Sequence, residues 1–403
     1  MTVQKDITIV GGGVVGMLLA IALARLSHRT LLIEKSMPKQ DQRSIVLSYS
    51  AVSVINALGI WAHIKNHVAY IEHVHVSEKK AYGQFHLDKE DEGLPFLGVV
   101  IKMHRLLAAL MTKLQSLQQI ETLFGCSVQK VEQASESRCG LTVTNQDNQI
   151  IDVRSQLIIA ADGTHSSIKN ALGINSKFHD YDQSALVFDL ELKRGHQNWA
   201  YERFINDGSI IAMLPMIGNN ASCVWALPHP QAQSIAEQPK DKILQLLQEV
   251  FGYRLGKFCS TQQPQLFPLA LVQAESLYQG NVLLFGNAAH FLHPVSAQGL
   301  NLSIRDVGIL YDLIAEQPHG SLSADNIYPQ YEKIRSNDHQ RTAMITHRLV
   351  DVFARESLIY KSLRRMGINI LQHTPLAKKS LSHLMMGKLN YGSSLMQHNV
   401  GFK

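Results

Sequence analysis

The feature that most constrains this chain is a glycine-rich turn near its start. Asp6–Val10 has the composition of a short buried strand, and Met17–Leu26 that of an apolar helix. Residues 11–16, with the sequence G-G-G-V-V-G, join the two. A second β-branched strand, Thr30–Ile33, follows and ends at Glu34. This order predicts a Rossmann-type βαβ unit that binds a dinucleotide.

The glycines of the G-x-G-x-x-G pattern have separate physical roles. Gly11 permits the tight turn, Gly13 lets the backbone approach a pyrophosphate, and Gly16 lets helix and strand pack closely. The free N–H groups and the positive end of the helix then face the phosphates. Glu34 can accept hydrogen bonds from both ribose hydroxyls, and we include its neighbour Lys35 among the predicted cofactor-binding residues. On this motif alone the nucleotide can be NAD or FAD.

Two later strand ends favour FAD. Residues 161–163 read A-D-G, and residues 286–290 read G-N-A-A-H. A nicotinamide dehydrogenase needs one glycine-rich turn, whereas a flavin bound in extended form needs further loops for its ribityl chain and ring. The two strand ends meet that need, so FAD is the predicted cofactor.

The pattern of predicted elements divides the chain into interleaved domains. Its 403 residues are enough for two fused cores. From Ser184 to Leu271 strands dominate, and Asn281–Phe285 returns to a buried strand. We therefore expect an α/β (α+β) fold, with a Rossmann-like FAD-binding domain interleaved with an antiparallel-sheet substrate domain and followed by a helical tail. The expected ranges are 1–75, 98–180 and 275–335 for the FAD-binding domain, 76–97 and 181–274 for the substrate domain, and 336–403 for the basic helical tail.

Positive charge is concentrated in the tail. Residues 341–403 contain ten basic and two acidic side chains, a net +8 in a chain of net +5. The tail is interpreted either as a solvated amphipathic helix or as a segment attracted to an anionic membrane or a partner. Nucleic acid is disfavoured as the main ligand, because no aromatic-rich basic stripe runs through the body of the chain.

Targeting and metal-binding patterns are not evident in the sequence. No signal peptide or membrane-spanning run stands out, which predicts a cytoplasmic protein with, at most, peripheral contact with the inner membrane. The four scattered cysteines lack zinc spacing. We expect reduced thiols and predict no metal.

Beyond these separate motifs, the chain resembles the flavoprotein aromatic hydroxylases of the para-hydroxybenzoate hydroxylase fold, and within them the ubiquinone-biosynthesis hydroxylases. The resemblance covers nearly the whole chain. It rests on the glycine motif with Glu34, Arg43 with Leu47-Ser48, residues 161–166 (A-D-G-T-H-S), 201–204 (Y-E-R-F), Leu214-Pro215, and 286–306 (G-N-A-A-H-F-L-H-P-V-S-A-Q-G-L-N-L-S-I-R-D). Asn287 stands where most members have Asp, which makes the chain similar to the branch that hydroxylates 2-polyprenyl-6-methoxyphenol.

The resemblance implies an FAD-dependent monooxygenase that hydroxylates the aromatic ring of a polyprenylated phenol in ubiquinone biosynthesis. NADPH or NADH would reduce the flavin, O2 would add at C4a to form a hydroperoxide, and the phenol ring would take the distal oxygen. The implied partners are the polyprenyl phenol, O2 and a candidate ubiquinone-biosynthesis complex.

The resemblance also assigns roles to individual residues. The carbonyl of Pro294 would face the substrate, and Arg43 would reach the FAD phosphates. The flavin ring would lie beside Gln298, Gly299, Leu300 and Asn301, with Pro294 and Gln298 as the predicted catalytic residues. Asp162 and Gly163 would line a groove shared with the nicotinamide donor, and Gly286 and Asn287 would contact ribityl or phosphate oxygens.

Two departures from the family pattern lie in the same loop. The family usually has a small residue and then G-Q-G after His-Pro, and Gly where Ser303 stands, whereas residues 296–299 here read S-A-Q-G. Ala297 adds a methyl group and disfavours a positive φ. Altered flavin mobility or oxygen reactivity is therefore an open expectation.

Several alternatives stay open. His290 and His293 are either bases for the phenol or histidines packed in the loop, the second being favoured. Residues on the second sheet either line the substrate side or belong to the core: Phe188, Tyr201, Phe204 and Met213. A flavin-dependent reductase of isoprenoids, a halogenase, or a non-catalytic FAD-binding component of a complex are the alternative functions. The isolated Trp61, Trp199 and Trp225 count against a halogenase.

Overall fold

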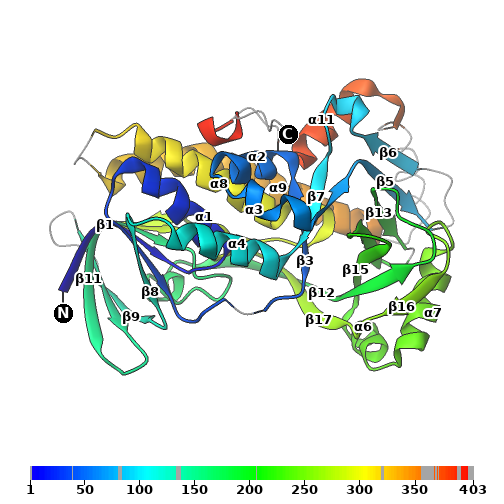
Figure 1. The fold of residues 1–403 in the computed structure, drawn as a ribbon, viewed down its shortest axis with the longest axis horizontal. Helices are drawn as coiled ribbons and strands as arrows, with labels where there is room; N and C mark the ends of the chain where they lie inside the picture. The colour runs from blue at the N-terminus through cyan, green and yellow to red at the C-terminus, as the bar shows by residue number, and fades with distance from the viewer. Residues whose placement is uncertain are drawn as a thin grey trace.

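The computed structural model describes residues 2–38, 40–79, 84–132, 138–205, 207–318, 322–354, 367, 370, 372–387 and 392–397. These residues form a mixed α/β structure with three sheets, in which helices cover one face of the first sheet and the second sheet lies at the other end of the molecule (Figure 1). The predicted fold class is confirmed.

The first sheet has eight strands and carries the glycine turn. Its main path is β18-β19-β11-β1-β2-β8, with β9 and β10 continuing from β11 as an antiparallel extension. β1 lies parallel to both β11 and β2, so the carboxyl ends of these three strands share one edge. The strands are β1 Thr2–Val10, β2 Thr30–Glu34, β8 Ile120–Phe124, β9 Ser127–Glu132, β10 Cys139–Thr144, β11 Ile150–Ala160, β18 Tyr278–Gln279 and β19 Val282–Leu284.

Burial explains why the first strand and helix are so apolar. The last four residues of β1 are buried, and every residue of α1 (Val14–Leu23) except Val15 is buried as well. A helix that is apolar on all sides belongs in a core. α1 packs on β2 and between α4 (Met103–Gln115) and α8 (Gln298–Ala315), so the turn that joins β1 to α1 is held on both sides.

The second sheet is nine-stranded, and a third sheet connects it to the first. The second sheet has the order β20-β17-β12-β15-β14-β13-β5-β6, with β16 paired to β12, and the third has the order β3-β7-β4. The second comprises β5 His73–Glu78, β6 Gln84–Asp88, β12 Ser176–Leu192, β13 Trp199–Phe204, β14 Ile210–Pro215, β15 Asn220–Pro228, β16 Phe258–Thr261, β17 Gln265–Ala274 and β20 His290–Phe291. The third comprises β3 Ser44–Ser48, β4 Val68–Ile71 and β7 Gly98–Lys102.

The helices pack on the sheets in separate groups. α8 lies against α1 and α2, α9 packs on α8, and α6 and α7 contact strands of the second sheet. The remaining α-helices are α2 Tyr49–Ala57, α3 Trp61–Ile64, α4 Met103–Gln115, α5 Ser167–Ala171, α6 His229–Ala236, α7 Lys240–Phe251, α8 Gln298–Ala315, α9 Ala324–Ala354 and α11 Pro375–Met385. Short 3-10 helices are η1 Ala24–Leu26, η2 Lys65–His67, η3 Glu90–Glu92, η4 Gly286–Ala288, η5 Val295–Ala297 and η6 Ser394–Met396.

Individual elements can be compared with the expectations. Residues 140–145 and 149–154, on either side of Asp147-Asn148, have the pattern that predicts a β-hairpin, and β10 is found paired antiparallel with β11. Residues 239–251 have a helical pattern, and the structure confirms this helix as α7. β12 begins at Ser176, earlier than predicted, because it pairs with β17 as well as β15. The domain ranges stay a prediction. Six of the tail's ten basic residues lie outside the described residues: Arg355, Lys361, Arg364, Arg365, Lys388 and Lys403.

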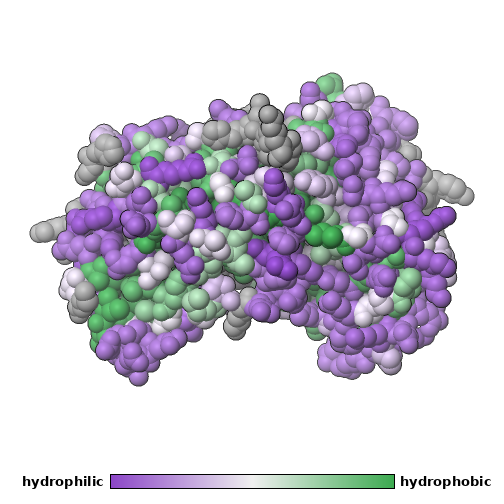
Figure 2. All heavy atoms as spheres, viewed as in Figure 1, coloured by the Kyte–Doolittle hydropathy of each residue, from purple (hydrophilic) through white to green (hydrophobic). Residues whose placement is uncertain are grey.

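The face of the molecule shown in Figure 2 is mostly polar. Hydrophilic side chains cover most of the face drawn in Figure 2, with a hydrophobic patch at its lower left over β11 and the neighbouring strands. Among the described helices, none is long and apolar enough to cross a membrane.

Candidate active site

A cavity of about 570 Å³ lies between the first and second sheets, beside the third. It extends from the glycine turn to the loop before α8 and to the inner face of the second sheet. Its lining includes Gly13, Val14, Val15, Asp41, Arg43, Ser44, Ile45, Val46, Val74, Ala161, Gly163, Ala200, Glu202, Ala212, Leu214, Val224, Gly286, Asn287, His293, Pro294, Ala297, Gly299, Leu300 and Met385. One space therefore joins half of the predicted cofactor residues to an apolar wall.

The glycine turn leaves room for a ligand at one position. A Cβ added to Gly11, whose φ is +112°, would lie 2.2 Å from the Ala161 carbonyl oxygen, and one added to Gly16 would lie 1.9 Å from that of Gly11. A Cβ added to Gly13 would meet nothing within 4 Å. Gly13 also begins α1 without a side-chain cap, so the helix N-terminus faces the cavity with N–H groups available to phosphate oxygens. The turn thus fits a pyrophosphate.

Glu34 is fixed beside this turn. Its Oε2 accepts a hydrogen bond from the Gly12 N–H at 2.5 Å, and its Oε1 accepts one from the Ser36 N–H at 3.0 Å. The carboxylate is therefore held at the end of β2, where a ribose would follow the pyrophosphate. Lys35 is exposed and does not line the cavity.

The other predicted cofactor loops meet on the same cavity. Gly163, Gly286 and Asn287 line it. The side chain of Asp162 instead accepts hydrogen bonds from Ser167 Oγ and the Ile168 N–H, both at 3.4 Å, at the start of α5. Asp162 thus shapes the loop around Gly163, without lining the cavity itself.

Arg43 lies at the polar end of the cavity. Its guanidinium forms an ion pair with Asp41 at 2.5 Å and lies 5.1 Å from the centroid of the Phe267 ring. The Arg43 side chain forms part of the cavity lining, as does Asp41. Arg43 is therefore placed to exchange its carboxylate partner for a phosphate.

The loop from Pro294 to Asn301 divides into two sets. Pro294, Gly299 and Leu300 line the cavity, whereas the side chains of Gln298 and Asn301 point elsewhere. Gln298 Nε2 donates to the Met385 carbonyl at 3.1 Å. Asn301 accepts from the Ser48 N–H at 2.8 Å and donates to the carbonyls of Val46 and Ala297 at 3.0 and 2.7 Å. Asn301 thus fastens α8 to β3, and the catalytic and cofactor roles of this loop stay a prediction.

Ala297 adopts the left-handed conformation that favours glycine. Its φ is +50° and ψ is +35°, directly before α8, and it lines the cavity. The sequence departure from glycine therefore falls on a position where the backbone needs a positive φ. An alanine is strained there by about 1 to 2 kcal/mol.

The inner face of the second sheet forms the apolar wall. Ala200 and Glu202 alternate with Tyr201, and cross-strand neighbours on the inner face add Ala212, Leu214 and Val224. Glu202 is the acidic side chain in this wall and is 9% exposed. Glu202 lies in the Y-E-R-F segment that carries the family resemblance, but the sequence did not predict it as a site residue.

Of the aromatic and sulfur residues proposed for the substrate side, only Tyr201 is part of the cavity lining. Its side chain alternates with those of Ala200 and Glu202, so its ring is directed to the opposite face of β13, where it contacts His75. Its ring also packs edge-on to Phe251 of α7, at 5.9 Å between centroids. Phe188, Phe204 and Met213 are in the hydrophobic core, which is the alternative left open for them.

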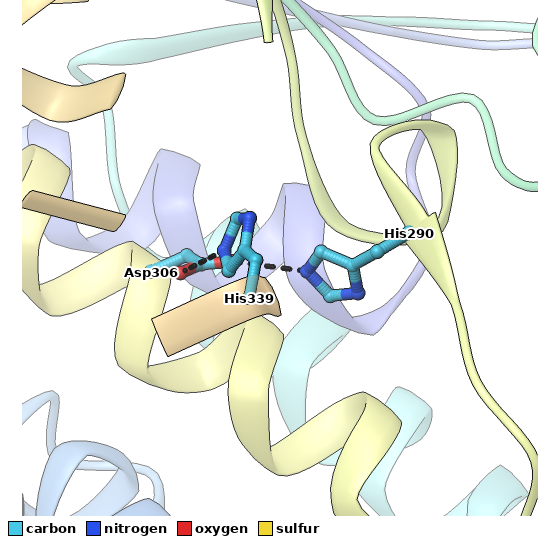
Figure 3. Close-up of side chains that lie close together, drawn as sticks. All are labelled: His290, Asp306 and His339. Carbon is cyan, nitrogen blue, oxygen red and sulfur yellow. Dashed lines mark hydrogen bonds and ion pairs between the residues drawn. The ribbon is translucent and has the colours of Figure 1, made fainter. Parts of the chain in front are cut away.

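The two loop histidines differ in position. His293 lines the cavity and is 1% exposed, its Nδ1 accepts from the Val295 N–H at 3.1 Å, and burial lowers its pKa to about 3. It is therefore neutral at physiological pH. His290 does not line the cavity, and it contacts Asp306 of α8 and His339 of α9 instead (Figure 3).

The buried cluster around Asp306, of which Figure 3 draws three residues, has a charge balance that favours a structural role. The Asp306 carboxylate lies 3.2 Å from His290 Nε2, 3.0 Å from His339 Nε2 and 2.5 Å from Arg335 Nε. Arg335 and Arg305 also pair with Asp338, at 2.7 and 3.4 Å. Two acids thus balance two guanidinium groups in a buried place. A dication bound to Asp306 would add charge beside Arg335, so this arrangement is a poor metal site.

Comparison with known proteins agrees with this geometry. Residues 4–346 match the model of the FAD binding domain family. A protein of Synechocystis, described only as uncharacterized, is 31% identical over 96% of this chain and 94% of its own length. Ubiquinone hydroxylase UbiL of Rhodospirillum rubrum is 28% identical over 96% of this chain and 90% of its own. The crystal structure of PqsL, a probable FAD-dependent monooxygenase from Pseudomonas aeruginosa, superimposes with a TM-score of 0.76 at 18% identity, covering 91% of this chain and 99% of that one.

The fold and cavity define a protein of the dinucleotide-binding class, in which the glycine turn and the second sheet line one cavity. The chain belongs to the FAD-binding-domain family, and it is similar over most of its length to ubiquinone hydroxylases. The predicted resemblance is thereby confirmed.

Proposed function

We propose that this protein uses FAD, NAD(P)H and O2 to hydroxylate the aromatic ring of a polyprenylated phenol in ubiquinone biosynthesis. The observation that carries the proposal is that one cavity joins the glycine turn, which has room for a phosphate at Gly13, to an apolar wall. The family relationship to ubiquinone hydroxylases supports the same substrate class. The identity of the phenol, the choice of NADPH or NADH and the oxygen chemistry are part of the proposal.

Different residues of the cavity would bind different parts of the cofactor. Bound FAD would accept hydride and activate oxygen. The N–H groups at Gly13 and the start of α1 would hold its pyrophosphate, with Arg43 as counter-charge. The loop at Pro294–Leu300 would border the ring, at the N-terminus of α8, whose dipole favours negative charge.

The apolar wall suits a neutral, hydrophobic ring. Ala212, Leu214 and Val224 would exclude water from the place where oxygen transfer must outcompete the release of hydrogen peroxide. Glu202 is positioned to accept a hydrogen bond from a phenolic hydroxyl, which favours attack through the electron-rich ring. A carboxylated ring would be repelled by the same side chain.

The test is turnover of the purified holoenzyme with a short-chain prenylated phenol. We expect NAD(P)H consumption that requires both O2 and the phenol, and one atom of labelled O2 in the product, detected by mass spectrometry. Consumption without O2, giving a reduced isoprenoid, indicates the alternative reductase. A flavoprotein that consumes no NAD(P)H with any phenol tested supports the non-catalytic alternative and contradicts the proposal.

Location and partners belong to the same proposal. A prenylated substrate partitions into membranes, so we propose a cytoplasmic protein that works at the periphery of the inner membrane, alone or within a biosynthetic complex. The basic tail is one candidate for this contact, although most of its charged residues lie outside the described part of the chain.

A further inference from the structure

The outer face of the second sheet, opposite the cavity, carries a cluster of rings and cations on β6, β5 and β13. Here His75 stands between His86 and Tyr201, with ring centroids 4.6 and 5.5 Å away. Trp199 stacks on His73, its neighbour across β13 and β5, with 4.6 Å between the ring centroids. The cavity-lining side chains of β13 lie on the other face of the same strand, so this cluster is separate from the candidate active site.

Two arginines bring positive charge to this face. Arg203 is half-buried in β13, and Arg254 follows α7. Phe251, three residues before Arg254, packs its ring on Tyr201 at 5.9 Å, which places the end of α7 and the adjoining Arg254 beside the cluster. Besides burial, the charge of Arg254 lowers the pKa of His75 and of His86. Burial and the charge of Arg254 both lower the pKa of Arg203.

These cations have no acidic partner among the described residues. Asp88, which lies opposite His73 on β6, hydrogen-bonds His73 at 2.6 Å. His75 is 2% exposed, yet neither ring nitrogen has a hydrogen-bond partner, and the Nε of Arg203 is likewise unpartnered. Like charges gathered around buried unpaired donors are unfavourable unless an anion joins them. The cluster on this face therefore favours binding of a negatively charged group.

We propose that His75, Arg203 and Arg254 form a binding site for a phosphate group, presented by an acidic phospholipid at a membrane surface. Arginine binds phosphate oxygens through charge-assisted hydrogen bonds. Trp199 and Tyr201 are half-buried beside the site, and Tyr253, next to Arg254, is 73% exposed. Trp and Tyr favour the membrane–water interface. The lipid source rests on the proposed function, because a polyprenylated substrate is collected from a membrane.

The test is co-sedimentation of the full-length, FAD-loaded protein with vesicles of phosphatidylcholine, with or without phosphatidylglycerol. We expect binding that needs phosphatidylglycerol, and about a 30-fold loss of affinity in R203Q/R254Q, since each basic contact contributes roughly 1 kcal/mol. K240Q is the matched control, because Lys240 is an exposed cation at the other end of α7. Equal binding by the double variant and the wild type, or equal weakening by K240Q, overturns the proposal.

Two further measurements keep the result decisive. If R203Q/R254Q loses the flavin spectrum, R254Q alone replaces it, because Arg254 is exposed. Calorimetry with inorganic phosphate separates the sources: variant-sensitive binding of free phosphate without variant-sensitive binding to vesicles overturns the lipid assignment. Vesicle binding is measured without turnover, so the two proposals are tested separately. A wild-type protein that binds vesicles through this face but hydroxylates no phenol would contradict the proposed function and support the phosphate site.

Discussion

At Gly13 an added side chain would meet no protein atom within 4 Å, whereas at Gly11 and Gly16 it would collide with backbone oxygens. The three glycines of one motif are therefore required for different reasons. Gly11 and Gly16 are needed for the fold, and Gly13 is needed for what the fold binds. Ala297 is the converse case, a residue with a side chain where the backbone conformation favours none.

Replacement of Gly13 by alanine should separate ligand binding from folding. Its φ of −72° is open to alanine, so we expect G13A to unfold at nearly the wild-type temperature in the absence of FAD. The new methyl group would occupy the approach of the pyrophosphate and weaken FAD binding at least about tenfold. Fluorescence titration and thermal denaturation measure both effects. G16A is the control, since its Cβ would lie 1.9 Å from the Gly11 oxygen and should destabilise the apoprotein. Unchanged FAD affinity in G13A would contradict this role.

Replacement of Ala297 by glycine should relieve strain. We expect A297G to be more stable by up to about 1 kcal/mol, because the relief of the left-handed alanine exceeds the added entropy of the unfolded chain. Urea denaturation measures this change. A108G provides the comparison, since Ala108 is an exposed residue in the middle of the helix α4, where glycine should destabilise by roughly 0.5 to 1 kcal/mol. Destabilisation of similar size in both variants would show that Ala297 is not strained.

Elements are joined by buried polar contacts around α8. Asn301 ties the start of this helix to β3, and Asp306, in its middle, ties it to β20 and α9. The first contact positions the loop that borders the cavity. The second holds the long helix α9 against the FAD-binding core. Both contacts lie outside the cavity and act on it through the position of α8.

Removal of the Asp306 charge should weaken the packing of α8 and α9. D306N would leave the buried guanidinium of Arg335 with Asp338 as its remaining acid, and we expect a loss of about 3 to 5 kcal/mol in the free energy of unfolding. Urea denaturation of the apoprotein tests this estimate. D312N is a control on the same helix, because Asp312 caps the exposed Ser394 and should contribute much less. A loss no larger than that of D312N would rule out a structural role for the cluster.

At the scale of the whole molecule, buried histidines should make stability sensitive to mild acid. Burial lowers the pKa of His75 and His293 to about 3 and that of His339 to about 4, from 6.5. Below pH 6.5 the unfolded chain takes up protons that the folded chain refuses, so stability is full above pH 6.5 and falls toward pH 4. Urea midpoints between pH 7.5 and 4.5 check this slope, and H339Q should reduce it. A midpoint constant over that range would contradict the assigned burial.

The limits of prediction follow the same physical division. The turn at residues 11–16 and its acid were readable because local backbone geometry determines their sequence. Glu202 and Met385 were not identified, since their place in the cavity depends on strand pairing and on a helix distant in sequence. The family resemblance predicted that Gln298 and Asn301 lie beside the flavin ring. Their side chains are directed toward Met385 and β3 instead, which only the tertiary contacts show. The third sheet was missed because its strands are short and are ordered by packing.

The central claim is that an FAD molecule lies along the cavity, from Gly13 to the loop at Pro294–Leu300. The most direct measurement is titration of the purified apoprotein with FAD, followed by visible absorption and flavin fluorescence. We predict uptake of one equivalent with the spectrum of a protein-bound oxidised flavin, and weaker uptake by G13A than by the wild type. A folded protein that stays colourless and leaves the fluorescence of added FAD unchanged would contradict the account.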